Sequence, residues 1–366
     1  MLSLSLSILI LKYYSRDTLP VINLREGDLL AVQASHIHPV PRLGGLAIFI
    51  GFVVSAFFAP QSIEYEVQLI MLAATPLFVA GLLEDIGYHI TPKGRLLAAL
   101  FSSLLTAIFL GFWLPRFGFP AIDYYFSFAI IGIPITLLVC SALSNAVNLI
   151  DGVNGLAASS SAVSFLGFML ISYHAGQLEL MIVAAMILAA ILGFLVLNFP
   201  RGLIFLGDAG SYVLGHLIAW IGILIMVRVE NISPWAVLLC AFWPAADTLL
   251  AIFRRVWAKA PMMSADREHF HHVIMDFLNK IPAFRGNINI TNPLSTLVLL
   301  PFMLFPAAIG VFYYESPIHS FLYFIIFMFV YVTSYYALKN IYGKLINKGF
   351  SKSADANLWS LPICLC

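Results

Sequence analysis

Carboxylates and cations that could handle a phosphate group occur together in one short polar segment. Glu84 and Asp85 are adjacent and are followed by Lys93 and Arg95. Carboxylate oxygens can ligate a hard cation, and Lys and Arg can bind phosphate oxygens. The pair ends an apolar run that we expect to be helical, and a helix C-terminus disfavours negative charge. We therefore expect another element to stabilise these carboxylates.

The segment NAVNLIDGVNGLAA combines amides, a carboxylate and glycines. Asn145, Asn148 and Asp151 are spaced at i, i+3 and i+6, so a helix would place them on one face. Gly152 would end that helix just beyond. Such side chains could ligate a hard cation or hydrogen-bond a base and a ribose, although polar packing between helices is the alternative.

The segment FLGDAGS places Asp208 directly before another apolar run. The start of a helix exposes N–H groups that can bind phosphate, and an aspartate there could hold Mg²⁺ against that phosphate. The alternative is that Asp208 or Ser211 only caps the helix.

The segment DREHFHH contains His269, His271 and His272. Apolar residues at helical spacing follow it and predict an amphipathic helix that could lie flat on the membrane: Phe270, Val273, Ile274, Phe277 and Leu278. The three histidines cannot all face one metal from a regular helix, and nearby Cys ligands are absent. We expect them to contact phosphate rather than zinc. Asp247 is expected to pair with Arg254 rather than to take part in chemistry.

The composition indicates which elements must position these side chains. Of 366 residues, 61% are hydrophobic and 10% are charged. Soluble domains contain about 25% charged residues, so this is the composition of a membrane protein. Nothing alternates as a transmembrane β-strand would. We predict an all-α polytopic protein with a single membrane-embedded domain over 1–366.

About eleven apolar stretches are predicted to span the membrane. They are 1–12, 43–60, 67–84, 95–114, 125–147, 156–173, 179–198, 211–229, 235–253, 294–313 and 320–338. The first stretch is predicted to be a shortened transmembrane helix rather than a signal peptide, because its positive charges follow the apolar run. Residues 339–366 are predicted to form a cytoplasmic tail.

Loop charge predicts the orientation. With the N-terminus outside and the C-terminus in the cytoplasm, all but Arg116 and Arg228 of the 19 Lys and Arg residues lie in cytoplasmic segments. The polar segments described above then share the cytoplasmic face. A transporter with an acidic ion pathway, which is an alternative interpretation, should instead carry its acids near the bilayer midplane.

Taken in order, PRLGG, LLEDIGYHITPKGRLL, NAVNLIDGVNGL, FLGDAGS and DREHFHH resemble the motifs of a known family, over about residues 35–275. That family is glycosyltransferase family 4, the polyprenyl-phosphate N-acetylhexosamine-1-phosphate transferases. It also includes the peptidoglycan translocase for phospho-MurNAc-pentapeptide. The resemblance implies transfer of an amino-sugar phosphate from a UDP-sugar to undecaprenyl phosphate, with release of UMP. It also implies a Mg²⁺ cofactor, which Mn²⁺ could replace, and a bacterial inner-membrane location with the active site facing the cytoplasm.

The resemblance assigns roles by position. The implied catalytic residues are Glu84, Asp85, Asp208, His271 and His272, and we also expect Lys93 to be catalytic because a cation can stabilise the transferring phosphate. The implied substrate contacts are Asn148, Asp151 and Asn154 of the nucleotide loop, His269, and Phe205, whose ring would stack on uracil. From their residue types we also expect substrate contacts at Arg42, Gly152 and Arg267. The implied metal ligands are Asp208 and Asp151. Two departures from the family pattern are Glu84, where the pair is usually Asp-Asp, and Asn154, where a second acid is usual.

The histidine segment distinguishes two branches of that family. Its HxHH form resembles the amino-sugar transferases that start lipid-linked cell-envelope glycans, such as O-antigen or teichoic acid, rather than the triple-His form of the peptidoglycan enzyme, which stays an alternative. The expected partners are the UDP-sugar, the polyprenyl phosphate and the bilayer, with no nucleic acid, and a homodimer could form. The identity of the sugar stays open.

Overall fold

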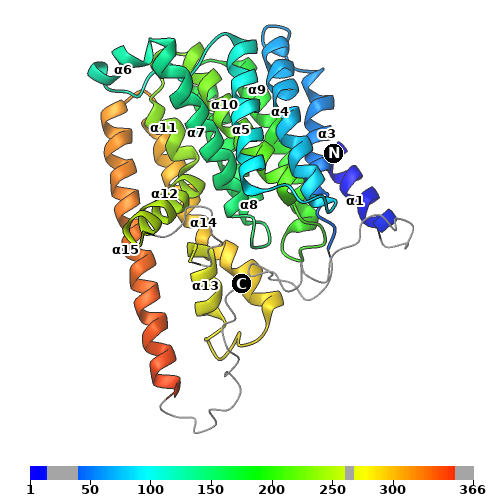
Figure 1. The fold of residues 1–366 in the computed structure, drawn as a ribbon, viewed down its shortest axis with the longest axis vertical. Coiled ribbons are helices and arrows are strands. Elements are labelled where there is room, and N and C mark those ends of the chain that lie inside the picture. The colour runs from blue at the N-terminus through cyan, green and yellow to red at the C-terminus, as the bar shows by residue number, and fades with distance from the viewer. Residues whose placement is uncertain (15–39, 260–267, 351–366) are drawn as a thin grey trace.

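A computed structural model describes residues 1–14, 40–259 and 268–350, except the side chains of 344–350. The described part is helical without any strand, which confirms the all-α prediction (Figure 1). Its helices are α1 (Leu2–Tyr14), α3 (Gly44–Ala56), α4 (Glu64–Asp85), α5 (Pro92–Leu110), α6 (Pro120–Phe126), α7 (Ala129–Leu149), α8 (Leu156–His174), α9 (Leu178–Asn198), α10 (Gly207–Arg228), α11 (Pro234–Cys240), α12 (Phe242–Trp257), α13 (Phe270–Leu278), α14 (Ile288–Phe312) and α15 (Pro317–Phe350).

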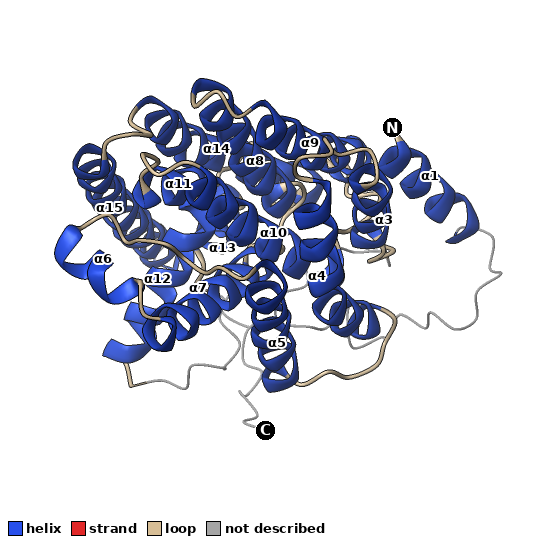
Figure 2. Cartoon of the chain, turned by 90° about the horizontal axis from the view of Figure 1, so that it is seen from above, coloured by secondary structure: helices blue, strands red, loops and turns tan. Residues whose placement is uncertain are grey.

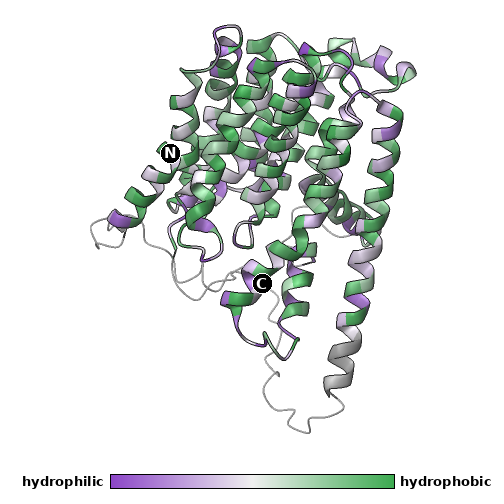
Figure 3. Cartoon of the chain, turned by 180° about the vertical axis from the view of Figure 1, so that it is seen from behind, coloured by the Kyte–Doolittle hydropathy of each residue, from purple (hydrophilic) through white to green (hydrophobic). Residues whose placement is uncertain are grey.

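Within the described ranges, eight helices are long and apolar enough to cross a membrane, namely α4, α5, α7, α8, α9, α10, α14 and α15. Helices α1 and α3 are apolar but shorter. Figure 3 shows the same distribution, with hydrophobic residues along the bundle and hydrophilic residues mostly at its two ends. The predicted count of about eleven spans stays a prediction.

The predicted span over 235–253 is a bent pair of helices in the structure. Helices α11 and α12 meet there at an angle of 92°. Pro244 lies in the first turn of α12 and has no N–H to donate to the carbonyl of Cys240. That carbonyl instead accepts a hydrogen bond from the Ser164 hydroxyl at 3.0 Å. The helical hydrogen-bond ladder is therefore interrupted at the bend.

Helix α10 forms the centre of the bundle, as the view from above shows (Figure 2). Of its most apolar 18-residue window, 94% is buried inside the protein. Small residues let its neighbours approach at backbone distance. A Cβ added at Gly45 of α3 would lie 2.2 Å from the Gly210 nitrogen, and one added at Gly81 of α4 would lie 2.6 Å from the Ala209 Cα. The first turn of α10 is thus clamped between α3 and α4.

The two basic residues that the loop-charge argument left on the opposite face are both satisfied within the protein. The Arg116 guanidinium donates to the carbonyls of Met226, Val229 and Ile232 at 3.1, 2.8 and 2.7 Å, just where α10 ends. Arg228 forms an ion pair with Glu66. These contacts explain why two cations are found among the acidic residues of that end.

The last helix extends well beyond the bundle. Helix α15 has 34 residues, or about 50 Å at 1.5 Å per residue, whereas the hydrocarbon layer is about 30 Å thick. Figure 1 shows its orange-red end projecting past the loops that carry the polar segments. The first part of the predicted tail, residues 339–350, is therefore a helical extension, and residues 351–366 lie outside the described residues.

Candidate active site

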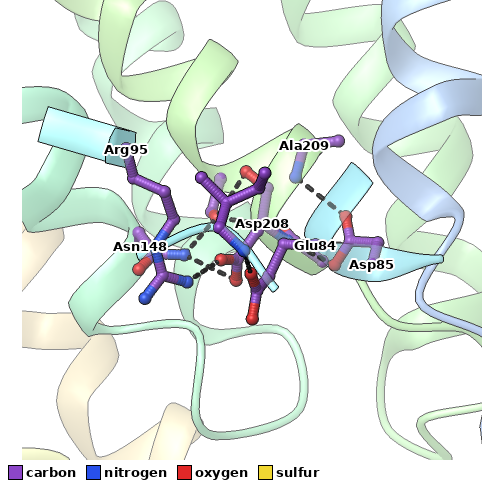
Figure 4. Close-up of polar contacts among 9 residues, drawn as sticks. Glu84, Asp85, Arg95, Asn148, Asp208 and Ala209 are labelled. Atoms are coloured by element: carbon purple, nitrogen blue, oxygen red, sulfur yellow. Dashed lines mark hydrogen bonds and ion pairs between the residues drawn. The ribbon is translucent and has the colours of Figure 1, made fainter. Parts of the chain in front are cut away.

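The carboxylate of Asp85 caps the start of α10 from the end of α4. Its two oxygens accept hydrogen bonds from the backbone N–H groups of Asp208 and Ala209, both at 2.9 Å (Figure 4). No side chain at the N-cap position of α10 itself makes such a bond. Asp85 ends its own helix, where the dipole disfavours it, but it lies at the favourable end of α10. This contact is the additional stabilisation that the sequence required.

Asp208 stands in the first turn of α10 between a cation and an amide. Its carboxylate forms an ion pair with the Arg95 guanidinium of α5 and accepts a hydrogen bond from the Asn148 amide of α7 at 3.1 Å. The Asn148 amide also donates to the Ser211 hydroxyl at 2.9 Å. In the view of Figure 4, Arg95 and Asn148 approach Asp208 from one side, and Glu84 and Asp85 are on the other. Three of the predicted polar segments thus meet at one carboxylate.

The predicted phosphate site on free N–H groups of this helix start is wrong in part, because Asp85 occupies two of those groups. Asp208 also lies inside the helix rather than before it, since α10 begins at Gly207. Gly207 has a φ of +75°, and a Cβ there would lie 2.6 Å from an Asp85 oxygen and 2.3 Å from the Arg42 carbonyl oxygen. A side chain at this position would therefore displace the cap.

The loop that contains Asp151 completes the acidic group. Burial raises the pKa of Asp151 well above its usual value; the nearby Arg42 partly offsets this, whereas Asp208 and Asp85 raise it further. Three carboxylates therefore share this end of α10, and their negative charge is only partly compensated. Helix α7 ends at Leu149, so Asp151 does not continue its polar face as the spacing had suggested.

Glu84 and Lys93 frame the loop between α4 and α5. One Glu84 carboxylate oxygen accepts the Ile90 N–H at 2.7 Å, and the Thr91 hydroxyl caps α5 through the Gly94 N–H at 3.1 Å. Lys93 follows in the first turn of α5 and is exposed. Glu84 therefore holds the loop that presents Lys93 at the edge of the acidic group.

The PRLGG segment is joined to FLGDAGS by backbone hydrogen bonds. The Phe205 N–H donates to the Pro41 carbonyl at 2.9 Å, and the Gly44 N–H donates to the Phe205 carbonyl at 2.9 Å. This pairing places Arg42 near the Asp85 and Asp151 carboxylates. Phe205 is half-buried in the same loop.

The histidine segment packs against the NAVNLIDGVNG loop. A Cβ added at Gly152 would lie 3.0 Å from the His271 Nε2 and 3.5 Å from the His272 Cε1. His271 is fully buried, and its burial, with the adjacent His272, lowers its pKa well below 6.5. The predicted helix is confirmed as α13, but its histidines do not form a solvated face, because all three are buried.

The expected pair between Asp247 and Arg254 is wrong. The Asp247 carboxylate lies 2.5 Å from the His269 Nδ1, whereas Arg254 pairs with Glu268. His269 and Asp247 are both almost completely buried, while Glu268 is exposed. Asp247 therefore binds His269 of the histidine segment, whereas Arg254 pairs with Glu268, the exposed acid that precedes His269.

Residues 67–226 match the model of glycosyl transferase family 4. A protein of Bacillus subtilis (strain 168), "Probable undecaprenyl-phosphate N-acetylglucosaminyl 1-phosphate transferase", is 31% identical over 243 residues, which cover 66% of this chain and 67% of that protein. The chain belongs to glycosyl transferase family 4. The "Undecaprenyl-phosphate alpha-N-acetylglucosaminyl 1-phosphate transferase" of Yersinia pestis is 28% identical, and that of Escherichia coli (strain K12) is 29% identical. The matches cover 64% of this chain in both cases and 66% and 65% of those proteins, so about two thirds of each relative's length is matched.

Asn154 of this family 4 protein has mainly structural contacts. It is 5% exposed; its N–H donates to the Asn292 side chain at 2.8 Å, its amide donates to the Pro200 carbonyl at 3.0 Å, and its carbonyl accepts from the Thr296 hydroxyl at 2.7 Å. These contacts tie the loop to α14, and the expected substrate contact of Asn154 stays a prediction.

Asn198 and Asn292 were missed as residues that shape the site of the family 4 protein. The Asn198 side chain accepts the Gly155 N–H and donates to the Ile204 carbonyl, both at 2.7 Å. A polar amide at the end of an apolar span is the signal that could have found them. Arg267, expected to contact substrate, lies outside the described residues.

The acidic group of the family 4 protein fits a divalent cation by the chemistry of its donors. Asp208 and Asp151 offer carboxylate oxygens, and Mg²⁺ is commonly held by one or two carboxylates together with substrate phosphates. Burial, followed by the neighbouring Asp208 and Asp85, raises the pKa of Asp151, and a cation bound there would favour its ionised form. Within the described ranges no three His, Cys, Asp or Glu side chains form a ready metal cluster.

Proposed function

We propose that this family 4 protein transfers an N-acetylhexosamine 1-phosphate, with N-acetylglucosamine 1-phosphate as the first candidate, from a UDP-sugar to undecaprenyl phosphate. The observation that carries the proposal is the convergence of Asp85, Asn148, Arg95 and Asp208 at the start of α10. The printed names of the relatives support this sugar and this lipid acceptor. The product would start a lipid-linked cell-envelope glycan.

The reaction exchanges one pyrophosphate bond for another. An oxygen of the lipid phosphate attacks the β-phosphorus of the UDP-sugar, the bond from that phosphorus to the bridging oxygen breaks, and UMP leaves with the bonding electrons. A phosphate monoester has a second pKa near 6, so at neutral pH the attacking group is largely dianionic without a general base. The protein then has to position the two substrates and stabilise charge.

The cations of the site supply that charge stabilisation. Arg95 is oriented by Asp208, Lys93 is presented by the loop that Glu84 holds, and Arg42 lies near Asp85 and Asp151. Cations fixed in advance near the transferring phosphoryl group stabilise the transition state without reorganising during the reaction.

Asp85 acts as a positioning residue in this scheme rather than as a base. Both of its oxygens already accept backbone N–H groups, and it is 8% exposed. Its contribution is to fix the first turn of α10 and with it the Asp208 carboxylate. One Glu84 oxygen accepts the Ile90 N–H and so holds the loop before Lys93, and the carboxylate could also orient Lys93 or a substrate.

Asp208 and Asp151 would hold Mg²⁺, or Mn²⁺ in its place. When bound, such an ion neutralises charge on the pyrophosphate. The two carboxylates come from different elements, the first turn of α10 and the loop between α7 and α8, so their spacing depends on Asp85 and Asn148. His271, His272 and His269 would contact phosphate or sugar next to Gly152.

We also propose a location in the bacterial plasma membrane with the site facing the cytoplasm, the N-terminus outside and the C-terminus inside. The eight long helices together with α1, α3 and the bent α11–α12 pair would give eleven spans. The Lys and Arg residues that the loop-charge argument assigns to the cytoplasmic segments support this orientation. A homodimer would be compatible with this arrangement.

The function is tested by offering the purified protein UDP-GlcNAc, UDP-GalNAc and UDP-MurNAc-pentapeptide with undecaprenyl phosphate and Mg²⁺. We expect UMP release that requires both substrates and that favours an amino-sugar donor. Preference for the pentapeptide donor would support the peptidoglycan alternative. Absence of UMP with every donor, from protein that unfolds cooperatively on heating, would refute the proposal.

A further inference from the structure

One face of α15 touches the elements that carry the histidine segment. Tyr331, Tyr335 and Lys339 are spaced at i, i+4 and i+8, so they lie along one stripe of the helix. Tyr331 and Tyr335 are both fully buried. Tyr331 packs edge-on against Trp243 of α12 and Phe270 of α13, with ring centroids 5.4 and 5.2 Å apart. The stripe thus joins α15 to both neighbouring helices.

Asp247 is the polar centre of this junction. One oxygen accepts the Tyr331 hydroxyl at 2.7 Å and the Phe270 N–H at 3.1 Å, and the other lies 2.5 Å from the His269 Nδ1. A carboxylate that accepts several hydrogen bonds is fixed in orientation. An acceptor at the Nδ1 of a histidine also fixes the tautomer and the rotation of its ring. Tyr331 therefore acts on His269 through Asp247.

His269 connects this junction to the candidate active site. Its ring stacks on His271 with centroids 5.7 Å apart and planes 16° apart, and the rings of His271 and His272 are 4.2 Å apart. Among the described residues neither buried ring nitrogen of His271 has a hydrogen-bond partner, and its Nε2 lies against Gly152. Buried polar atoms are nearly always paired, so such an orphan marks a place where a ligand can bind.

A second contact secures the residue just before His269. Glu268 accepts from Arg254 of α12 and from Lys339 of α15, both at 2.8 Å. Arg254 also donates to the Tyr335 hydroxyl at 2.8 Å. The start of α13 is therefore held at two successive residues, one buried through Asp247 and one exposed through Glu268.

We propose that Tyr331 is a positioning residue for the transfer reaction. By orienting Asp247 and His269, Tyr331 holds the histidine segment against Gly152. The inference rests on the proposed function and extends it to the C-terminal helix, which contributes no side chain to the acidic group in the described residues. We assign the positioning role to the buried hydrogen bond between Tyr331 and Asp247 rather than to the ion pairs of Glu268, because those exposed pairs are screened by solvent.

The test compares Tyr331→Phe with Tyr335→Phe. Each removes one buried hydroxyl from α15 and keeps the ring, but only Tyr331 bonds to Asp247. We expect Tyr331→Phe to lower kcat for UMP release by about tenfold, the scale of a lost hydrogen bond to a charged group. The melting temperatures of the two variants should match. The kcat of Tyr335→Phe should stay within about twofold of that of the unmodified protein, because the ion pair between Arg254 and Glu268 remains.

A double-mutant cycle with Asp247→Asn separates positioning from general destabilisation. If Tyr331 acts through Asp247, adding Tyr331→Phe to Asp247→Asn changes kcat little further, whereas independent effects would multiply. Multiplying effects, or equal kcat for the two tyrosine variants, would overturn the inference. If Asp247→Asn does not fold, the comparison of kcat between Tyr331→Phe and Tyr335→Phe tests the inference by itself. An unmodified protein that releases no UMP would refute the proposed function itself, which is a distinct outcome.

Discussion

Replacing Asp85 by Asn should destabilise the protein, because Asp85 caps α10. The carboxylate accepts two backbone N–H groups at 2.9 Å, and an amide can accept only one of them while pointing its NH₂ at the other. Losing a hydrogen bond to a charged group costs about 1.5–3 kcal/mol. At a pH where Asp85 is ionised, losing the favourable charge at the start of the helix costs about 0.3–1 kcal/mol more. We therefore expect a loss of about 2–4 kcal/mol in the free energy of unfolding.

An opposing effect makes the sign of the change informative. The substitution also removes one of three neighbouring carboxylates, which relieves repulsion with Asp208 and Asp151. If Asp85 were only a general base without a structural role, this relief would raise the melting temperature. A fall therefore means that the cap outweighs the repulsion.

Glu84→Gln is the matched control, since it makes the same change of charge at the adjacent position. Glu84 is half-buried, and its recorded bond goes to a loop N–H rather than to α10. Thermal unfolding in detergent, without metal or substrate, should show a fall of several degrees for Asp85→Asn and about 1 °C or less for Glu84→Gln. An unchanged or raised melting temperature for Asp85→Asn would refute the capping argument.

Three further predictions follow from other contacts. Asp208→Asn should reduce UMP release by at least about 100-fold at every Mg²⁺ concentration, as measured by steady-state kinetics; recovery at high Mg²⁺ would show that Asp208 affects only metal affinity. His271 stays neutral in the folded protein, because burial and His272 lower its pKa well below 6.5, whereas the unfolded chain takes up a proton below about pH 6.5. Stability should therefore fall as the pH falls from 6.5 to 5, by up to about 1.4 kcal/mol per pH unit from this group, and His271→Gln should flatten that slope in thermal unfolding at several pH values. Arg116→Met should lower the free energy of unfolding by about 2–4 kcal/mol, since three carbonyls lose a charged donor. Arg228→Met, which removes only an ion pair with Glu66, should lower it by less than about 1 kcal/mol. Equal melting temperatures for the two variants would contradict this.

The sequence predicted the helical fold and the participants of the acidic group better than it predicted their contacts. Hydropathy located most helices to within a few residues, but it could not show the bend at Pro244, because both arms of the bend are apolar. The unfavourable position of Asp85 at the end of α4 indicated that a partner was missing. Its partner is 123 residues away in the chain, and no local pattern connects the two.

Local spacing gave a wrong prediction where a partner close in the sequence competed with one that is distant in the sequence. Arg254 is two turns from Asp247 on the same helix, so pairing them was the local expectation. The structure pairs Asp247 with His269 because both are buried, and it leaves Arg254 to the exposed Glu268. Asn154, interpreted as a substrate contact by position, also ties its loop to α14 and to the Pro200 carbonyl, which local spacing could not show. Burial, which decides both cases, is a property of the assembled bundle.

The central claim is that the site transfers a phosphorylated sugar rather than the sugar alone. The direct measurement uses UDP-N-acetylglucosamine labelled with ³²P at the β-phosphorus, together with undecaprenyl phosphate and Mg²⁺. The account predicts that the label moves into the lipid fraction while unlabelled UMP is released, and that Asp208→Asn abolishes both. Label that stays in water as UDP, with sugar appearing on the lipid, would contradict it.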